Sequence, residues 1–147
     1  MRNIFKLTAL VLLVLNTFTS IARADLFVVV NVANPVTALS QKEVTDIFMG
    51  RSKTFPSKAY AKPLDLPRGD ALRTEFYQAL TGMGAAQLNS YWSRLLFSGQ
   101  TTPPPMLGDE AAMLQTVRSD PSALGYLGTA PTDAQVRVVF TLKTSTK

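Results

Sequence analysis

Apolar and polar positions along this chain follow two periodicities, which predict alternating strands and helices. Residues 26–33 form a nearly continuous apolar, β-branched run, typical of a strand buried on both faces. Shorter patterns predict strands at 59–66, interrupted by Pro63, at 124–127, and at 136–142, where the alternation is that of a half-exposed strand. This order predicts an α/β fold in which a small mixed β-sheet is covered by helices.

Capping residues and helical spacing place four helices between these strands. Ser40 and Glu43 form a capping box that opens the first helix, and Gly50 closes it. Further helices are predicted at about 70–80, at 85–97 and at 109–117. The faces expected to point inward are Val44, Ile47 and Phe48 in the first helix; Leu72, Phe76 and Ala79 or Leu80 in the second; Leu88, Trp92, Leu95 and Leu96 in the third; and Met113 and Val117 in the fourth.

The first 24 residues have the features of a cleavable export signal. Two basic residues precede the apolar run 7–15, and Ala22-Arg23-Ala24 has the small-residue pattern of a cleavage site. We therefore expect a periplasmic protein that begins at Asp25; an uncleaved anchor is the alternative. Removing the leader leaves 12 basic residues against 10 acidic ones, a formal charge of +2, so composition does not favour nucleic-acid binding.

The residue types present argue against several classes of function. The chain contains no cysteine and no histidine, which excludes disulfides, Ser-His and Cys-His nucleophile pairs and histidine-based zinc sites. No pair of carboxylates or lysines has a spacing that suggests catalysis. We expect residues 25–147 to form one domain that is not an enzyme and holds no metal or cofactor.

The segment from Leu64 to Phe76 carries the strongest candidate site. A strand is expected to end near Asp65, and a helix to begin near Asp70 after a Pro-Arg-Gly turn. Backbone N–H groups at such a helix start, together with the positive end of the helix dipole, favour an anion. Two interpretations of Asp70 remain open, an N-cap of its own helix or a ligand contact, and the N-cap is the commoner role.

Three further segments match a known family in order and spacing. They are Val28–Asn31, an apolar strand ending in Asn; Leu39–Arg51, which is similar to Leu-Thr…Ile-Phe-Xaa-Gly-Lys; and Pro121–Leu127, which is similar to Pro-Gly-Ala-Ile-Gly-Tyr-Val. Over residues 26–127 the chain thus resembles the phosphate-binding proteins of ABC transporters, with Phe55 where the family usually has Trp. The resemblance implies a three-layer lobe of the type 2 periplasmic-binding fold. The family's proteins close two lobes on a ligand, so a single lobe is expected to capture its ligand weakly unless it forms a homodimer or docks on a partner.

The family's phosphate loop, Arg-Xaa-Asp-Xaa-Ser-Gly-Thr, is altered here. An ungapped match keeps Arg68, Asp70 and Thr74 but places Leu72 and Arg73 at the Ser and Gly positions, whereas anchoring on the helix's apolar residues places Asp70 over Ser. In that second alignment a carboxylate lies at the anion-binding position itself. A like charge about 4 Å from an anion costs on the order of 4 kcal/mol at an effective dielectric near 20. By resemblance, the candidate ligand-binding residues are Arg68, Gly69, Asp70, Ala71, Arg73 and Thr74.

Two hypotheses follow for the function. The first is an exported solute-binding protein that holds phosphate or another oxyanion at the helix start. The second is an interaction or sensory accessory that has lost its ligand and acts with a periplasmic partner, a membrane transporter or a membrane sensor. An apolar exposed patch or a self-associating edge strand would favour the second.

Overall fold

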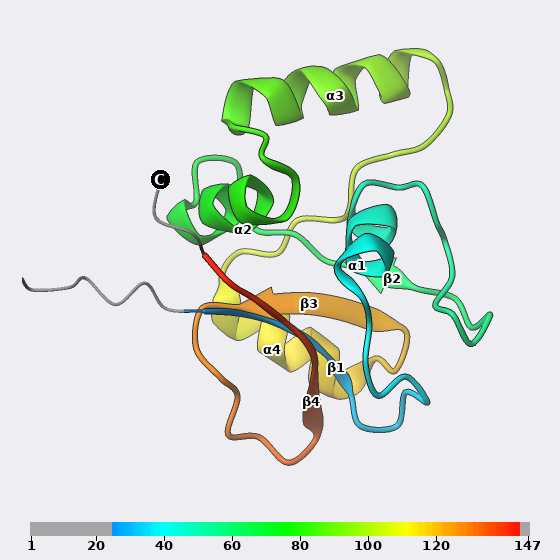
Figure 1. Ribbon diagram of the computed structural model, residues 1–147, viewed down its shortest axis with the longest axis vertical. Helices are drawn as coiled ribbons and strands as arrows, with labels where there is room; N and C mark the ends of the chain where they lie inside the picture. Colours follow the sequence, from blue (N-terminus) through cyan, green and yellow to red (C-terminus); the bar gives the residue numbers. More distant parts are fainter. Residues whose placement is uncertain (1–24, 145–147) are drawn as a thin grey trace, which may run out of the picture.

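The computed structural model describes residues 25–144, so the predicted leader lies outside the described residues. A central sheet lies between helices, and one helix projects from the body of the molecule (Figure 1). The elements in chain order are β1 (Leu26–Asn31), α1 (Gln41–Phe48), β2 (Lys62–Pro63), α2 (Ala71–Thr81), α3 (Ala85–Phe97), α4 (Glu110–Ser119), β3 (Ala123–Leu127) and β4 (Val136–Leu142). All eight predicted elements are present, and the predicted α/β class is confirmed.

The sheet is mixed, with the strand order β2-β3-β1-β4. The buried strand β1 is antiparallel to both of its neighbours, and β2 runs parallel to β3. The strand predicted at 59–66 is much shorter than expected, since β2 has two residues flanked by isolated bridges at Tyr60 and Asp65. Pro63 explains this because it has no N–H to donate, which also suits its position at the edge of the sheet.

The alternation predicted for β4 is broken by a bulge. Val28 pairs with Phe140 and Val29 pairs with Val138, so Val139 is an extra residue in the ladder. The extra residue reverses the facing of the side chains beyond it. For this reason the buried positions of β4 are Val136, Val139 and Leu142, spaced by three residues rather than by two.

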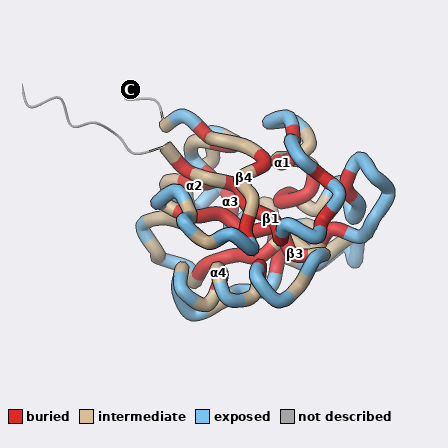
Figure 2. The backbone as a smooth tube through the Cα atoms, turned by 90° about the horizontal axis from the view of Figure 1, so that it is seen from below, coloured by how far each residue is buried: buried red, intermediate tan, exposed pale blue. Residues whose placement is uncertain are grey.

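Helices cover both faces of the sheet, as the predicted three-layer arrangement requires. The Tyr126 ring of β3 stacks on Phe76 of α2, with centroids 3.9 Å apart, and meets Phe48 of α1 edge-on. The preceding residue of the strand, Gly125, faces the opposite side, where a Cβ atom would lie 3.0 Å from side-chain carbons of Met113 and Val117 in α4. Glycine is therefore what lets α4 approach the sheet. The buried residues gather between these layers (Figure 2).

The helix α3 lies apart from the sheet and packs on the end of α1. The Tyr91 hydroxyl donates to the Met49 carbonyl at 2.7 Å, and Trp92 is buried, as predicted for the core. Leu96 was expected on the buried stripe, but 48% of it is exposed, because the C-terminal turn of α3 extends beyond its support. Its neighbour Phe97 is 95% exposed. No helix within residues 25–144 has the length and apolar character needed to cross a membrane.

Candidate functional site

The start of α2 is closed by its own N-cap residue. The Asp70 carboxylate accepts hydrogen bonds from the backbone N–H groups of Leu72 and Arg73, at 2.8 and 3.1 Å. These are the amides that an anion at this helix start would need, and the negative charge at the positive end of the dipole is already supplied. Of the two interpretations of Asp70, the structure supports the N-cap.

The remaining candidate residues lie around this turn in different environments. Arg68 is exposed, and its guanidinium has no hydrogen bond or ion pair within the described part of the chain. Gly69 has a φ of +87°, which favours glycine at this point of the turn. Ala71 is exposed, and the Thr74 hydroxyl donates to the Asp70 carbonyl at 3.1 Å. The structure thus brings five of the six residues together at the surface.

Arg73, the sixth, points into the protein instead. Its Nε donates to the Asp65 carboxylate at 2.9 Å, and the exposed fractions of the two side chains are 5% and 0%. The guanidinium also lies over the Tyr77 ring, 5.2 Å from its centroid. A guanidinium held in this way is not directed to an external ligand.

The Asp65 carboxylate is the centre of a buried hydrogen-bond cluster. One oxygen accepts from the Tyr126 hydroxyl at 2.7 Å and from the Leu66 N–H at 2.9 Å. The other accepts from Arg73 and, at 3.3 Å, from the Tyr77 hydroxyl. Four donors thus satisfy one buried charge, which is the condition under which such a charge is tolerated.

Both tyrosines of this cluster are held in the protonated state. Burial is the main cause that raises the pKa of Tyr77 and of Tyr126 well above its ordinary value. The Asp65 carboxylate adds to this, because a second negative charge beside it is unfavourable. The hydroxyl protons therefore stay on the donors that Asp65 needs.

The helical pattern correctly predicted Phe76 and Leu80 on the inner face of α2, but not Arg73 and Tyr77, so this cluster was not predicted. The buried residues of α2 are Arg73, Phe76, Tyr77 and Leu80, whereas Leu72 and Ala79 are only half-buried. The spacing of Arg73, Tyr77 and Leu80 is itself that of one helical face. It was missed because a charged residue was not expected on the buried side.

A second helix start lies beside the first and is also acidic. A Cβ atom at Gly128 would lie 3.2 Å from Leu72 in α2 and 3.8 Å from Glu110 in α4, which brings the two N-termini together. The Glu110 carboxylate accepts from the Gly128 N–H at 2.7 Å, and Asp109 caps α4 through the Ala112 N–H. Carboxylates therefore occupy the N–H groups along this edge of the fold.

A cavity of about 490 Å³ lies elsewhere and includes none of the six candidate residues. It is bounded by the end of α1, the segment around β2, the helix α3 and the connector 99–105. This cavity had not been predicted, because its lining residues are distant in sequence. No cluster of three or more acidic side chains that could hold a metal ion occurs within residues 25–144.

This fold, in which helices cover both faces of a small mixed sheet, is the fold of one part of the periplasmic-binding proteins. A crystal structure from Clostridium perfringens, of a candidate phosphate ABC transporter substrate-binding protein with bound phosphate, superimposes with a TM-score of 0.63 at 18% identity. An ABC-type phosphate transport receptor from Vibrio cholerae gives 0.62 at 18%, and a candidate phosphate-binding protein from Planctomyces limnophilus gives 0.58 at 15%.

Each superposition covers 79% of this chain, but only 40–45% of the other protein. The chain thus spans less than half the length of the solved proteins that it resembles. Comparisons with models of protein families and with curated proteins found no match. The expected fold is therefore confirmed, and the three neighbours are described as binding or receptor proteins, not as enzymes.

Removal of the buried guanidinium tests the role of the Asp65 cluster. We expect Arg73→Met to lower the free energy of unfolding by about 3–5 kcal/mol, because it leaves the Asp65 carboxylate buried without its cationic partner. Urea denaturation measures the change. Arg68→Met, at an exposed position, is the matched control and should change stability by about 0.5 kcal/mol or less. The Asp65→Asn/Arg73→Met double variant should regain part of the loss. If Arg73→Met were as stable as the control Arg68→Met, the assigned role of the ion pair would be contradicted.

The two protonated tyrosines predict a loss of stability in alkali. Above about pH 10 tyrosines ionise in the unfolded chain but stay protonated in the fold, so the unfolded state binds fewer protons. The free energy of unfolding should then fall by about 1.4 kcal/mol per pH unit for each of Tyr77 and Tyr126, and should not change through these groups below about pH 10. Urea unfolding between about pH 9 and pH 11 checks this. Tyr77→Phe should reduce the slope, and an unchanged slope would contradict the assignment.

Proposed function

We propose that this protein is an exported, non-enzymatic domain of the solute-binding fold that acts by contact with a periplasmic or membrane-bound partner protein. The observation that carries the proposal is the closed start of α2. The Asp70 carboxylate occupies the amides at which the family resemblance places an oxyanion. An anion at this point would have to displace that carboxylate or lie beside it.

The electrostatics of this edge also oppose oxyanion capture. Asp70 and Asp109 direct carboxylate oxygens to backbone N–H groups at the two helix starts, and Glu110 accepts from the nearby Gly128 N–H. Arg73 is neutralised by Asp65 inside the fold, so Arg68 is the cation of the candidate set that faces solvent. One exposed arginine does not offset several fixed negative charges.

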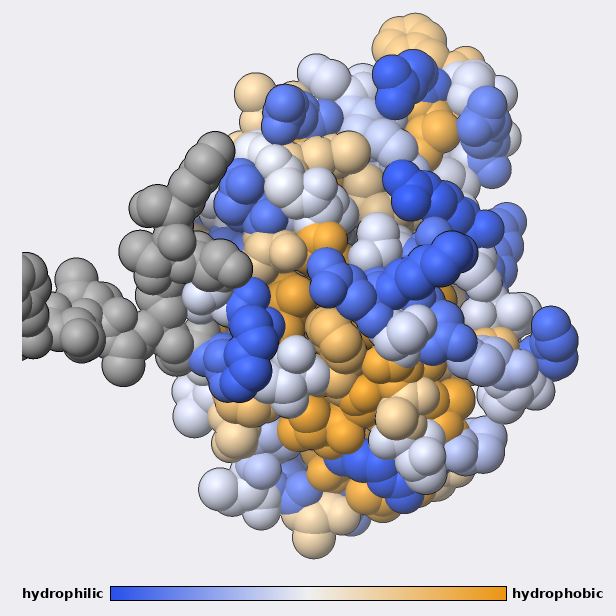
Figure 3. Space-filling view, in the orientation of Figure 1, coloured by the Kyte–Doolittle hydropathy of each residue, from blue (hydrophilic) through white to orange (hydrophobic). Residues whose placement is uncertain are grey.

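An apolar surface at the end of α3 supports contact with a partner. Phe97 is 95% exposed and the adjacent Leu96 is 48% exposed. Hydrophobic colouring appears over this projecting end of the molecule (Figure 3). A phenyl ring that stays in water gains no free energy from burial on folding, and a partner that covers it together with Leu96 would supply that gain, which favours an interaction surface. The partner class is a transporter component, a sensor or a second copy of this chain.

Binding of phosphate or another small oxyanion is the second candidate function. A structural neighbour is described as having bound phosphate, and Arg68, Gly69 and the exposed Ala71 lie at the turn to which the family resemblance of the sequence assigns an oxyanion. On this alternative the ligand would approach the outer side of the turn, with Arg68 as its cation. The two functions differ in their response to phosphate, so one titration separates them.

Calorimetric titration of the mature protein with phosphate, sulfate and acetate is the first test. We expect no binding of phosphate with a Kd below about 1 mM, because the Asp70 carboxylate already accepts hydrogen bonds from the backbone N–H groups that phosphate would need. Asp70→Ser keeps a side chain that can cap α2 but removes the charge, and should bind phosphate more tightly than the wild type. Submillimolar binding of phosphate by the folded wild type would replace the proposed function with the second one.

Site-specific photo-crosslinking in the periplasm tests contact with a partner. We expect a photoreactive amino acid at position 97 to give a discrete crosslinked species, because this side chain is fully presented to solvent. The same amino acid at the exposed position 115 of α4 is the control and should give none. Mass spectrometry distinguishes a second copy of the chain from another protein. Equal labelling from both positions would argue against a specific surface on α3.

A further inference from the structure

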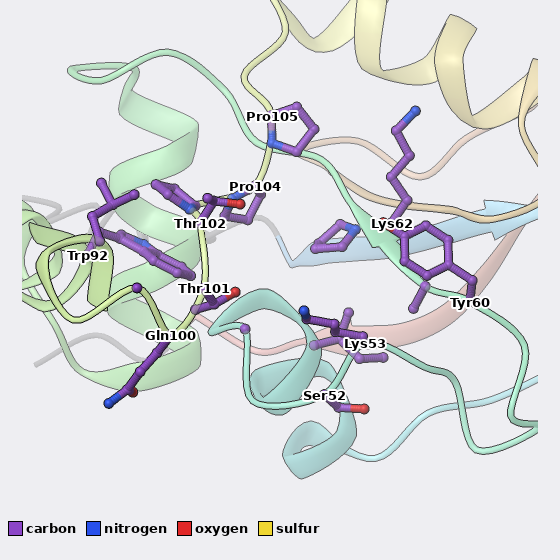
Figure 4. Close-up of a pocket in the computed structure, with 17 residues that line it drawn as sticks. Ser52, Lys53, Tyr60, Lys62, Trp92, Gln100, Thr101, Thr102, Pro104 and Pro105 are labelled. Carbon is purple, nitrogen blue, oxygen red and sulfur yellow. The ribbon is translucent and has the colours of Figure 1, made fainter. Parts of the chain in front are cut away.

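A groove separate from the start of α2 has the chemistry of a ligand site. Its cavity of about 490 Å³ is within the range of small-molecule sites, roughly 300–1,000 Å³. Residues 47–53, 60–63, 92–96 and 99–105 contribute to its lining (Figure 4). Two stretches of the chain that are distant in sequence, 47–63 and 92–105, thus surround one hollow.

The wall between α1 and α3 is closely packed. Gly50 has a φ of +71°, and a Cβ atom there would lie 2.9 Å from Thr101 and 3.4 Å from the Trp92 ring. A side chain at this position would push the connector and α3 away from α1. The hydrogen bond from Tyr91 to the Met49 carbonyl fastens the same contact. The groove is therefore a feature of the packed fold rather than a gap beside a loop.

The groove carries positive charge without a compensating carboxylate in its lining. Lys53 and Lys62 line it, and no Asp or Glu does. The Lys62 ammonium lies 3.3 Å from the Asp120 carboxylate, outside the groove. Lys53 has no side-chain hydrogen bond or ion pair within residues 25–144, and in Figure 4 its ammonium extends toward Thr101. An unpaired cation beside a hydroxyl favours an anionic group.

The rest of the lining is mainly apolar and contains flat rings. Tyr60 and Trp92 stand on opposite sides of the hollow in Figure 4, and the rings of Pro104 and Pro105 lie between them along one wall. Tyr60 is 61% exposed, so its ring is presented at the mouth of the groove. Trp92 is only 2% exposed, so little of its ring is open to a ligand. A flat apolar group placed against Tyr60 and the proline rings would lose contact with water.

From these observations we propose that the groove binds a small organic acid, whose carboxylate contacts the Lys53 ammonium and whose flat apolar body lies against Tyr60 and the rings of Pro104 and Pro105. Inorganic phosphate matches the charge but not the apolar walls. An uncharged aromatic molecule matches the walls but leaves Lys53 without a partner. The assignment does not depend on the proposed partner contact at Phe97, which lies outside the lining residues.

The chain supplies its own reporter for this site, because Trp92 is its one tryptophan. Titration of the folded mature protein with 3-phenylpropionate should change Trp92 emission with saturation, at a Kd of about 1 mM for a ligand of this size. The alcohol 3-phenylpropanol should bind about tenfold more weakly, since it lacks the charge that contacts Lys53. Inorganic phosphate should leave the emission unchanged.

Two variants at exposed positions test the named contacts without disturbing the core. Lys53→Gln should raise the Kd for 3-phenylpropionate about tenfold and bring it close to that of the alcohol. Tyr60→Ala should weaken the acid and the alcohol alike. Lys58→Gln is the matched control, because Lys58 is exposed but does not line the groove, and should bind as the wild type does.

Three results would overturn the assignment. One is the lack of a saturable change in Trp92 emission up to about 10 mM 3-phenylpropionate. Another is an equal Kd for the wild type and Lys53→Gln. The third is saturation by a blocked Phe-Glu dipeptide where 3-phenylpropionate fails, which would assign the groove to a peptide segment. None of these results depends on crosslinking at position 97, so a failure here is distinct from a failure of the proposed function.

Discussion

The buried ion pair between Asp65 and Arg73 is the constraint on which the rest of the structure depends. It joins the segment after β2 to the inner face of α2, and the hydroxyls of Tyr77 and Tyr126 tie the same carboxylate to α2 and β3. A buried charge is stable only while its partners surround it. These contacts therefore fix where α2 begins and how it lies on the sheet.

Because of this arrangement, the turn before α2 has a structural role and does not offer its amides to a ligand. The family resemblance of the sequence predicts that this turn presents amides and hydroxyls to phosphate. Here Asp70 satisfies the amides of Leu72 and Arg73, and the Arg73 guanidinium is directed into the core. The same strand-turn-helix geometry thus stabilises the fold from within. A shared fold does not bring the ligand chemistry of the proteins it resembles, since a few side chains decide where the charges point.

The helix α3 links the two surfaces to which function is assigned. Its last turn presents Phe97 to solvent, and the preceding turns supply Trp92 and Leu96 to the wall of the groove. Because Leu96 of α3 also lines the groove, an acid bound there would lie beside the helix that carries the exposed Phe97 ring. Ligand binding and partner contact would then involve one element of the fold.

The sequence by itself determined the elements and their class. The apolar run of β1, the capping box at Ser40 and the glycine after α1 act locally, so they could be recognised without the fold. The Asp70 cap was likewise foreseeable. The tertiary structure alone decided that Arg73 is buried, that a bulge rotates β4 and that residues 47–53 meet 99–105 in a groove. These features depend on the positions of partners distant in the chain, and local periodicity carries no information about where such partners meet.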